Sequence, residues 1–240
     1  MKLFTHKGLF ITATDTGAGK TLISGVVAKL ISQQGKKVGV FKPIATGCRT
    51  VKGKLISEDA EFLKYCCNSE LALDVITPIR YKIPAAPLAC EKAEKKKVNL
   101  STLFNAYEQI CRNSDFVVVE GIGGVKVPIT SDFDVLDLAK ALKLPVIIVA
   151  KAKLGTINHT LLTIEAVRRK GLLLAGIIIN GYDEKTVDFA EKTNAEFIKK
   201  LGKTKILAVV PDDKKTNMAK NIVGRKVTDA LRKINWLKIK

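Results

Sequence analysis

The sequence predicts an α/β fold, a three-layer sandwich in which a mostly parallel central sheet is flanked by helices. Short apolar runs rich in β-branched residues alternate along the chain with amphipathic segments. The runs VIIVA (146–150) and AGIIIN (175–180) are apolar at consecutive positions, which is typical of parallel strands covered on both faces. We therefore expect repeated βα units packed as a single domain over residues 1–240.

The expected elements follow from these patterns in chain order. Strands are predicted at 9–13, 37–41, 115–119, 145–150, 173–179 and 205–210. Helices are predicted at 22–31, 101–111, 135–142, 158–170 and 184–201, where apolar residues recur at helical spacing. The stretch 46–99 contains Pro78, Pro84 and Pro87 and is interpreted as an irregular insertion.

Composition excludes several classes of protein. The five cysteines form no CxxC pair and lie near no histidine at ligand spacing, so we expect reduced structural thiols. Only two histidines are present, which excludes chemistry built on several imidazoles. No run approaches the roughly 18 apolar residues of a membrane span, and the N-terminus lacks the pattern of a signal peptide. We expect a cytoplasmic protein.

The net charge of +18 raises the hypothesis of nucleic-acid binding. The excess is mostly lysine and is spread along the chain, whereas arginine is the residue suited to bidentate phosphate and base recognition. No aromatic residues are interleaved with these lysines as they are in single-strand binding surfaces. The pattern favours a solvated basic surface over a nucleic-acid footprint.

The stretch TATDTGAGKT (12–21) lies between a predicted strand and a predicted helix. A phosphate-binding loop (P-loop) needs glycines that turn backbone N–H groups inward, a lysine for the β- and γ-phosphates and a hydroxyl for magnesium. Gly17, Gly19, Lys20 and Thr21 supply these groups, although Thr14 stands where the strict pattern has glycine. The stretch therefore predicts nucleotide binding in a P-loop NTPase sandwich.

Two further residues lie at the ends of predicted strands. FVVVEGIGG (116–124) places Glu120 at the end of a buried strand, where ligands of parallel sheets gather, and Gly123 lies in the turn that follows. We interpret Glu120 as a magnesium ligand near the loop. Lys42 follows the second strand, and the residues alone favour an ordinary lysine that extends its ammonium into solvent.

These stretches together resemble the dethiobiotin synthetase family. The resemblance rests on TATDTGAGKT, KPIATG, the acid pair in ISEDAEFL, VVVEGIGG, LPVIIVAKAKLGTINHTLLT and LAGIIING, which occur in the family's order over about residues 8–182. It implies an ATP- and Mg²⁺-dependent ligase. The expected reaction carboxylates 7,8-diaminononanoate with CO₂ and closes the ureido ring through a carbamic–phosphoric anhydride, within biotin biosynthesis.

The resemblance also implies roles for individual residues. Lys20, Lys42 and Thr16 would be catalytic, and Thr46 would help to bind the substrate around the reacting centre. The metal would be held by Thr21, Asp59 and Glu120. The nucleotide would be bound by Asp15, Thr16, Gly17, Ala18, Gly19, Lys20, Thr21, Glu120, Gly123, Asn180 and Pro211.

Two of these implied sites lie outside the loop. Asn180 and Pro211 would contact the adenine base, although the segment after Pro211 departs from the family's pattern. Gly155, Thr156, Ile157 and Asn158 would bind the substrate's carboxylate across the interface of a homodimer. Without the resemblance, Asn158 would be interpreted simply as a helix cap.

Two other functions stay open at this stage. One is a dimeric P-loop ATPase switch of the partitioning or metal-insertion type. Many such proteins carry a second lysine early in the loop, where this chain has Asp15 or Thr16. The other is nucleic-acid binding through the basic excess.

Overall fold

The computed structural model describes residues 6–183 and 189–239. Six strands form one sheet in the order β10-β9-β8-β1-β7-β2, and every neighbouring pair is parallel. The strands are β1 (Gly8–Ala13), β2 (Val38–Phe41), β7 (Phe116–Glu120), β8 (Val146–Lys151), β9 (Leu174–Tyr182) and β10 (Ile206–Pro211). All six predicted strands are confirmed, and no end is shifted by more than three residues.

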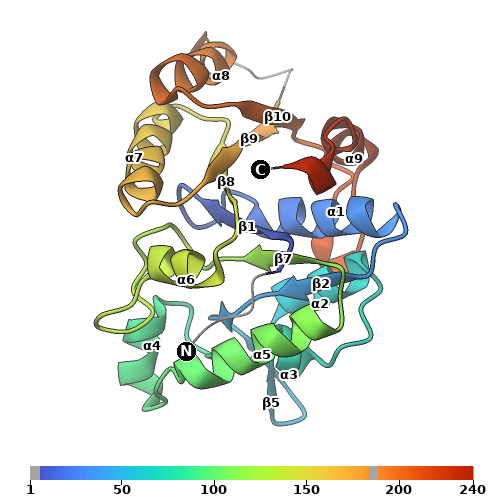
Figure 1. Ribbon diagram of the computed structural model, residues 1–240, viewed down its shortest axis with the longest axis vertical. Coiled ribbons are helices and arrows are strands. Elements are labelled where there is room, and N and C mark those ends of the chain that lie inside the picture. Colours follow the sequence, from blue (N-terminus) through green and yellow to red (C-terminus); the bar gives the residue numbers. More distant parts are fainter. Residues whose placement is uncertain (1–5, 184–188, 240) are drawn as a thin grey trace.

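Helices cover both faces of this sheet. They are α1 (Lys20–Ser32), α5 (Leu100–Arg112), α6 (Val135–Leu142), α7 (Thr156–Arg169), α8 (Phe189–Gly202) and α9 (Arg225–Arg232). Figure 1 shows α5, α6 and α7 on one side of the sheet and α1 and α9 on the other. Each side has its own apolar core, one built on Tyr107 and Leu138 and the other on Ile23 and Leu231. The predicted three-layer sandwich is confirmed.

The interpretation of 46–99 as irregular is wrong. The segment after β3 (Ile44–Ala45) contains a hairpin of β4 (Arg49–Val51) and β5 (Lys54–Ile56), then α2 (Glu58–Cys66), α3 (Leu73–Ile76), β6 (Ile79–Arg80) and α4 (Pro87–Glu94). Ser57 Oγ accepts a hydrogen bond from the Ala60 N–H and so caps α2. Pro87 occupies the first turn of α4, where a missing N–H costs nothing. The prolines mark element boundaries here.

The C-terminal part differs from expectation in two ways. The predicted helix at 184–201 begins at Phe189 in the structure, and its first five predicted residues lie outside the described residues. The helix α9 was not predicted; it has only eight residues, of which Val227 and Leu231, four positions apart, are buried. Two short 3₁₀ turns, Met218–Lys220 (η1) and Trp236–Lys238 (η2), flank it.

The structure also bears on the predictions about the cysteines and about membrane-spanning helices. All five cysteines are free and buried, as expected for structural thiols. In the described part of the chain, no helix is both long and apolar enough to cross a membrane.

Candidate functional site

The P-loop connects β1 to α1 at the carboxyl edge of the sheet. Gly17 and Gly19 have φ angles of 71° and 95°, in the left-handed region that glycine adopts without a steric penalty. A Cβ atom at Gly19 would also lie 2.1 Å from Asn180 Nδ2, so any side chain at this position would have to displace that amide. The helix α1 begins at Lys20 with no side-chain cap. The N–H groups of its first turn therefore remain available for an anion.

Lys20 is a buried cation without a carboxylate partner. Its side chain is 7% exposed, and its ammonium donates to the Asp15 carbonyl at 3.4 Å. No ion pair to Lys20 is found within residues 6–183 and 189–239. Burial, and then the neighbouring Lys42 ammonium, lower the pKa of Lys20 from 10.5 to about 8. An anion such as a phosphate would satisfy this charge.

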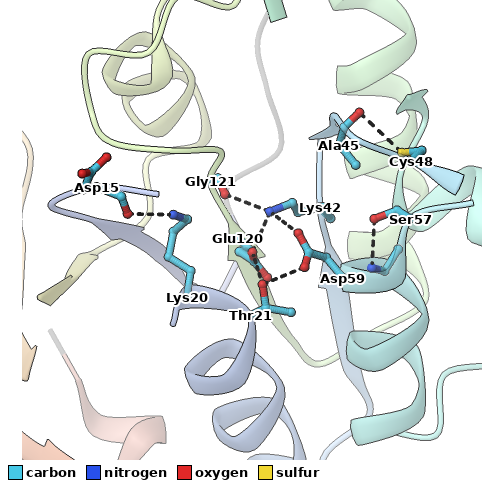
Figure 2. A network of polar contacts seen from close by, with 11 residues as sticks. Asp15, Lys20, Thr21, Lys42, Ala45, Cys48, Ser57, Asp59, Glu120 and Gly121 are labelled. Atoms are coloured by element: carbon cyan, nitrogen blue, oxygen red, sulfur yellow. Dashed lines mark hydrogen bonds and ion pairs between the residues drawn. The ribbon is translucent and has the colours of Figure 1, made fainter. Parts of the chain in front are cut away.

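Lys42, Asp59, Glu120 and Thr21 form a polar network beside the loop (Figure 2). Lys42 Nζ lies 2.6 Å from Glu120 Oε1 and 3.0 Å from Asp59 Oδ2, and it donates to the Gly121 carbonyl at 3.2 Å. Thr21 Oγ1 lies 3.0 Å from Asp59 Oδ1 and 2.9 Å from Glu120 Oε1, so its hydroxyl proton can bond either carboxylate. Lys42 is 4% exposed, so it is not the solvated lysine that the residues alone favoured.

The charges of this network stabilise one another. Burial alone would lower the pKa of Lys42, but Glu120 and Asp59 outweigh it and raise that pKa above its ordinary value. Burial likewise acts to raise the pKa of Asp59, but the Lys42 ammonium reverses the shift and lowers it. Burial raises the pKa of Glu120, and Lys42 opposes that shift. A single ammonium therefore holds two carboxylates together.

The same oxygens suit a magnesium ion. Thr21, Asp59 and Glu120 offer hard oxygen ligands, and Glu120 Oε2 is buried without a hydrogen-bond partner. Among the residues that the structure describes, no group of three His, Cys, Asp or Glu side chains could hold a metal by itself. Magnesium usually keeps several ligands from phosphate and water, so two carboxylates and one hydroxyl fit that ion. The predicted metal ligands lie together.

A cavity of about 610 Å³ brings the predicted catalytic residues together. Its lining includes Thr16, Gly17, Gly19, Lys20, Thr21, Lys42, Thr46, Asp59, Glu120 and Gly123. Ala18 is a buried residue of the loop itself, whereas Asp15 is exposed, and its carboxylate accepts from the Thr16 N–H at 2.6 Å. The cavity is large enough for a small ligand together with a triphosphate group.

A second cavity, of about 300 Å³, lies beyond the first turn of α1. Asn180 and Pro211, the two predicted base contacts, both line it. Its other lining residues are Leu22, Gly181, Asp212, Asp213, Lys214, Thr216 and Val227. The segment after Pro211 therefore shapes this cavity although it departs from the family's pattern.

The residues 155–158 lie apart from both cavities. They form the start of α7, with Gly155 at the N-cap position (φ 88°), and none of them lines the 610 Å³ cavity of the same chain. Asn158 is exposed and is not the helix cap, so that simpler interpretation is wrong. Thr156 is 4% exposed, and its hydroxyl is buried without a hydrogen-bond partner.

Sequence reasoning missed two residues near the site. Lys151 ends β8, and its Nζ lies 3.6 Å from where a Cβ on Gly17 would be, so a further ammonium lies beside the loop. Its place at the end of a strand is the signal that would have found it. Met218, in η1, lines the 610 Å³ cavity although it follows the P-loop by about 200 residues in the chain. Lys126 is not among the residues that line this cavity and instead pairs with Asp134, the N-cap residue of α6.

This chain is similar to one domain family and to several proteins that share a single name. A family profile described as an AAA domain matches residues 7–220. The ATP-dependent dethiobiotin synthetase BioD of Bacillus subtilis is 40% identical, covering 93% of this chain and 94% of its own. The enzyme of the same name from Methanocaldococcus jannaschii is 42% identical, covering 84% and 92%. That of Thermodesulfovibrio yellowstonii is 39% identical, covering 85% and 88%.

Solved structures share the fold at low identity. The MinC:MinD cell division protein complex of Aquifex aeolicus aligns with a TM-score of 0.60 and 14% identity, covering 94% of this chain and 92% of the other. A putative plasmid partition protein of Borrelia burgdorferi bound to AMPPNP aligns with a TM-score of 0.55 and 16% identity, covering 98% and 95%. At this identity the similarity establishes the architecture alone.

Proposed function

This chain belongs to the dethiobiotin synthetase family, and from that premise we propose how its residues carry out the reaction. The enzyme is a ligase of biotin biosynthesis that uses ATP and Mg²⁺. It carboxylates 7,8-diaminononanoate with CO₂ and closes the ureido ring, releasing ADP and phosphate. The observation that carries the assignment of residues is the 610 Å³ cavity, in which two lysines, two carboxylates and the P-loop meet.

The reaction divides into three steps that balance. One amine of the substrate attacks CO₂, and loss of a proton from nitrogen leaves a carbamate. A carbamate oxygen attacks the γ-phosphorus, and the bond to ADP breaks. The second amine then attacks the carbamoyl carbon, loses a proton and expels phosphate, which closes the five-membered ring.

Lys20 and Lys42 stabilise the negative charge of this sequence. Lys20 lacks a carboxylate partner, so its ammonium serves the β- and γ-phosphates. Lys42 lines the same cavity and stabilises the carbamate and the transferring phosphoryl oxygen. Thr16 and Thr46 also line the cavity and donate hydrogen bonds to the reacting groups.

The hydroxyl of Thr21 and the carboxylates of Asp59 and Glu120 would hold the magnesium ion. When bound, the ion neutralises charge on the triphosphate. The unpartnered Glu120 Oε2 supports this role, because a buried carboxylate oxygen without a partner is costly. Asn180 and Pro211 would contact the base, and their shared cavity supports that assignment.

The segment 155–158 acts, in this proposal, on the neighbouring subunit of a homodimer. Its position outside its own chain's cavity supports the idea. Leu154 (83% exposed), in the turn before α7, and Leu162 (57% exposed), within α7, are exposed apolar side chains on either side of Asn158 in the chain. We also propose that the chain works as one domain, because both apolar cores share the one large sheet. We further propose that it works in the cytoplasm, where ATP is abundant.

Phosphate release tests the assignment of the cavity. Wild type and Lys20→Ala are compared with Mg-ATP and bicarbonate, with and without 7,8-diaminononanoate. We expect release to require the diamine and to fall by orders of magnitude in the variant, since the lysine's charge acts mainly as the phosphoryl group moves. Equal rates in all four mixtures would rule the proposal out.

Subunit complementation tests the homodimer. Lys20→Ala and Asn158→Asp each inactivate a different part of the same composite site, the latter by repelling the substrate's carboxylate. Mixed after unfolding and refolding, the two inactive variants should recover about a quarter of wild-type activity, because half the dimers are mixed and each has one intact site. No recovery, with dimers verified by light scattering, contradicts an Asn158 that acts across the interface.

A further inference from the structure

Asn180 connects the base cavity to the P-loop. It lies in β9, which is bonded to β8 on one side and to β10 on the other, and Asn180 pairs with Lys151 and Val210 in these ladders. The Asn180 carbonyl also accepts from the Ala152 N–H at 2.9 Å. The backbone of Asn180 is therefore held in place by the sheet.

The side chain of Asn180 reaches into the loop. Asn180 Nδ2 donates a hydrogen bond to the Ala18 carbonyl at 3.0 Å, and these residues are 162 positions apart. The same Nδ2 would be 2.1 Å from a Cβ at Gly19. The amide thus packs directly against the Ala18–Gly19 peptide, and the glycine at position 19 makes this approach possible.

This contact orients the peptide that follows Ala18. A trans peptide is planar, and its C=O and N–H point in opposite directions. Because the Ala18 carbonyl is held on the Asn180 side, the Gly19 N–H is turned away from that side. The inward direction of loop N–H groups is what binds a phosphate, and donors fixed beforehand need no reorganisation when the anion arrives.

We propose that Asn180 is a positioning residue of the P-loop, acting on the triphosphate through the Ala18–Gly19 peptide independently of any contact with the base. This inference extends the proposed base-binding role, in which the loop and Asn180 act separately. It predicts that Asn180 affects the binding of a phosphate chain that carries no base at all.

Inorganic tripolyphosphate with Mg²⁺ tests this prediction, because it carries no base. Its affinity is measured by calorimetry for wild type, Asn180→Ala and Asn180→Leu. Leucine approximates the shape of asparagine without its donor, and melting temperatures verify that both variants fold. We expect both to bind tripolyphosphate about three- to tenfold more weakly, the range for one lost hydrogen bond. The affinity for ATP should fall further than that for tripolyphosphate, because the contact with the base is lost as well.

Pro211→Ala is the matched control, since Pro211 lines the base cavity and lies outside the loop. Its tripolyphosphate affinity should equal that of wild type. If the Asn180 variants also bind tripolyphosphate like wild type while ATP binding weakens, Asn180 acts only on the base and the inference is overturned. This result would leave diamine-dependent phosphate release intact, so it is separate from a failure of the proposed function.

Discussion

Lys42 Nζ and Glu120 Oε1 lie 2.6 Å apart, and both side chains are almost fully removed from solvent. A buried ion pair adds little net stability, but removing one partner leaves the other charge uncompensated. The pair therefore makes the catalytic centre sensitive to single substitutions.

The first prediction concerns this pair. Lys42→Met should reduce the free energy of unfolding by about 3–5 kcal/mol, because the Glu120 carboxylate loses its cation. The double variant Lys42→Met/Glu120→Gln should be more stable than Lys42→Met alone, since the buried Glu120 carboxylate is no longer left without its cation. Urea denaturation of the two single variants, the double variant and wild type gives the coupling energy. Additive losses would contradict the pairing.

The second prediction concerns Lys20. Its pKa of about 8 in the folded state lies below the unfolded value of 10.5, so the charged form is disfavoured by folding. Below pH 8 the lysine is protonated in both the folded and the unfolded state, so the full cost of burying its charge is present. As the pH rises from 8 to 10.5, the unfolded state binds more protons than the folded state, and the free energy of unfolding of wild type increases. Lys20→Met should therefore stabilise the free enzyme by roughly 3 kcal/mol at pH 7.

Chemical denaturation between pH 7 and 10.5 measures that difference. The advantage of Lys20→Met should shrink as the pH rises through this window. A variant that is less stable than wild type at pH 7 would contradict the account of Lys20 as an uncompensated cation.

The third prediction compares two glycines with positive φ. Gly19→Ala and Gly35→Ala both place a side chain in the left-handed region, which costs about 1–2 kcal/mol. A Cβ at Gly35 meets nothing within 4 Å, whereas one at Gly19 would lie 2.1 Å from Asn180 Nδ2. Melting temperature should therefore fall further in Gly19→Ala than in Gly35→Ala, and only Gly19→Ala should bind ATP more weakly than wild type. Equal losses would show that strain alone matters.

The fourth prediction concerns the capping box of α6. Asp137 accepts from the Asp134 N–H and pairs with Lys170. Burial acts to raise the pKa of Asp137, but these two partners outweigh it and lower that pKa from 3.8. The stability that Asp137 contributes is therefore present above about pH 4 and lost as the pH falls through the lower folded value.

Asp137→Ala tests this dependence. The variant should be about 1 kcal/mol less stable than wild type at pH 7, a typical net loss for one hydrogen bond. The difference should narrow as the pH falls towards 3, as followed by thermal denaturation. A difference that stays constant over this range would argue against a titrating Asp137.

The sequence determined the parts of the protein that rest on neighbouring residues. The loop from Thr12 to Thr21 could be assigned because its glycines, lysine and hydroxyl act through spacing along a single segment. The six strands were predicted because buried parallel strands are apolar at every position. Short elements such as α4 were missed, since one or two turns carry too little periodicity to outweigh nearby prolines.

Only the tertiary structure decided the partners of these residues. Lys42 lies 78 positions from Glu120, and Asn180 lies 162 positions from Ala18, so no local pattern could pair them. Parallel strands end at the same edge of the sheet, and this geometry brings distant side chains within hydrogen-bonding distance. The charge state of Lys20 likewise depends on burial, a property of the packed molecule that its position in the chain does not fix.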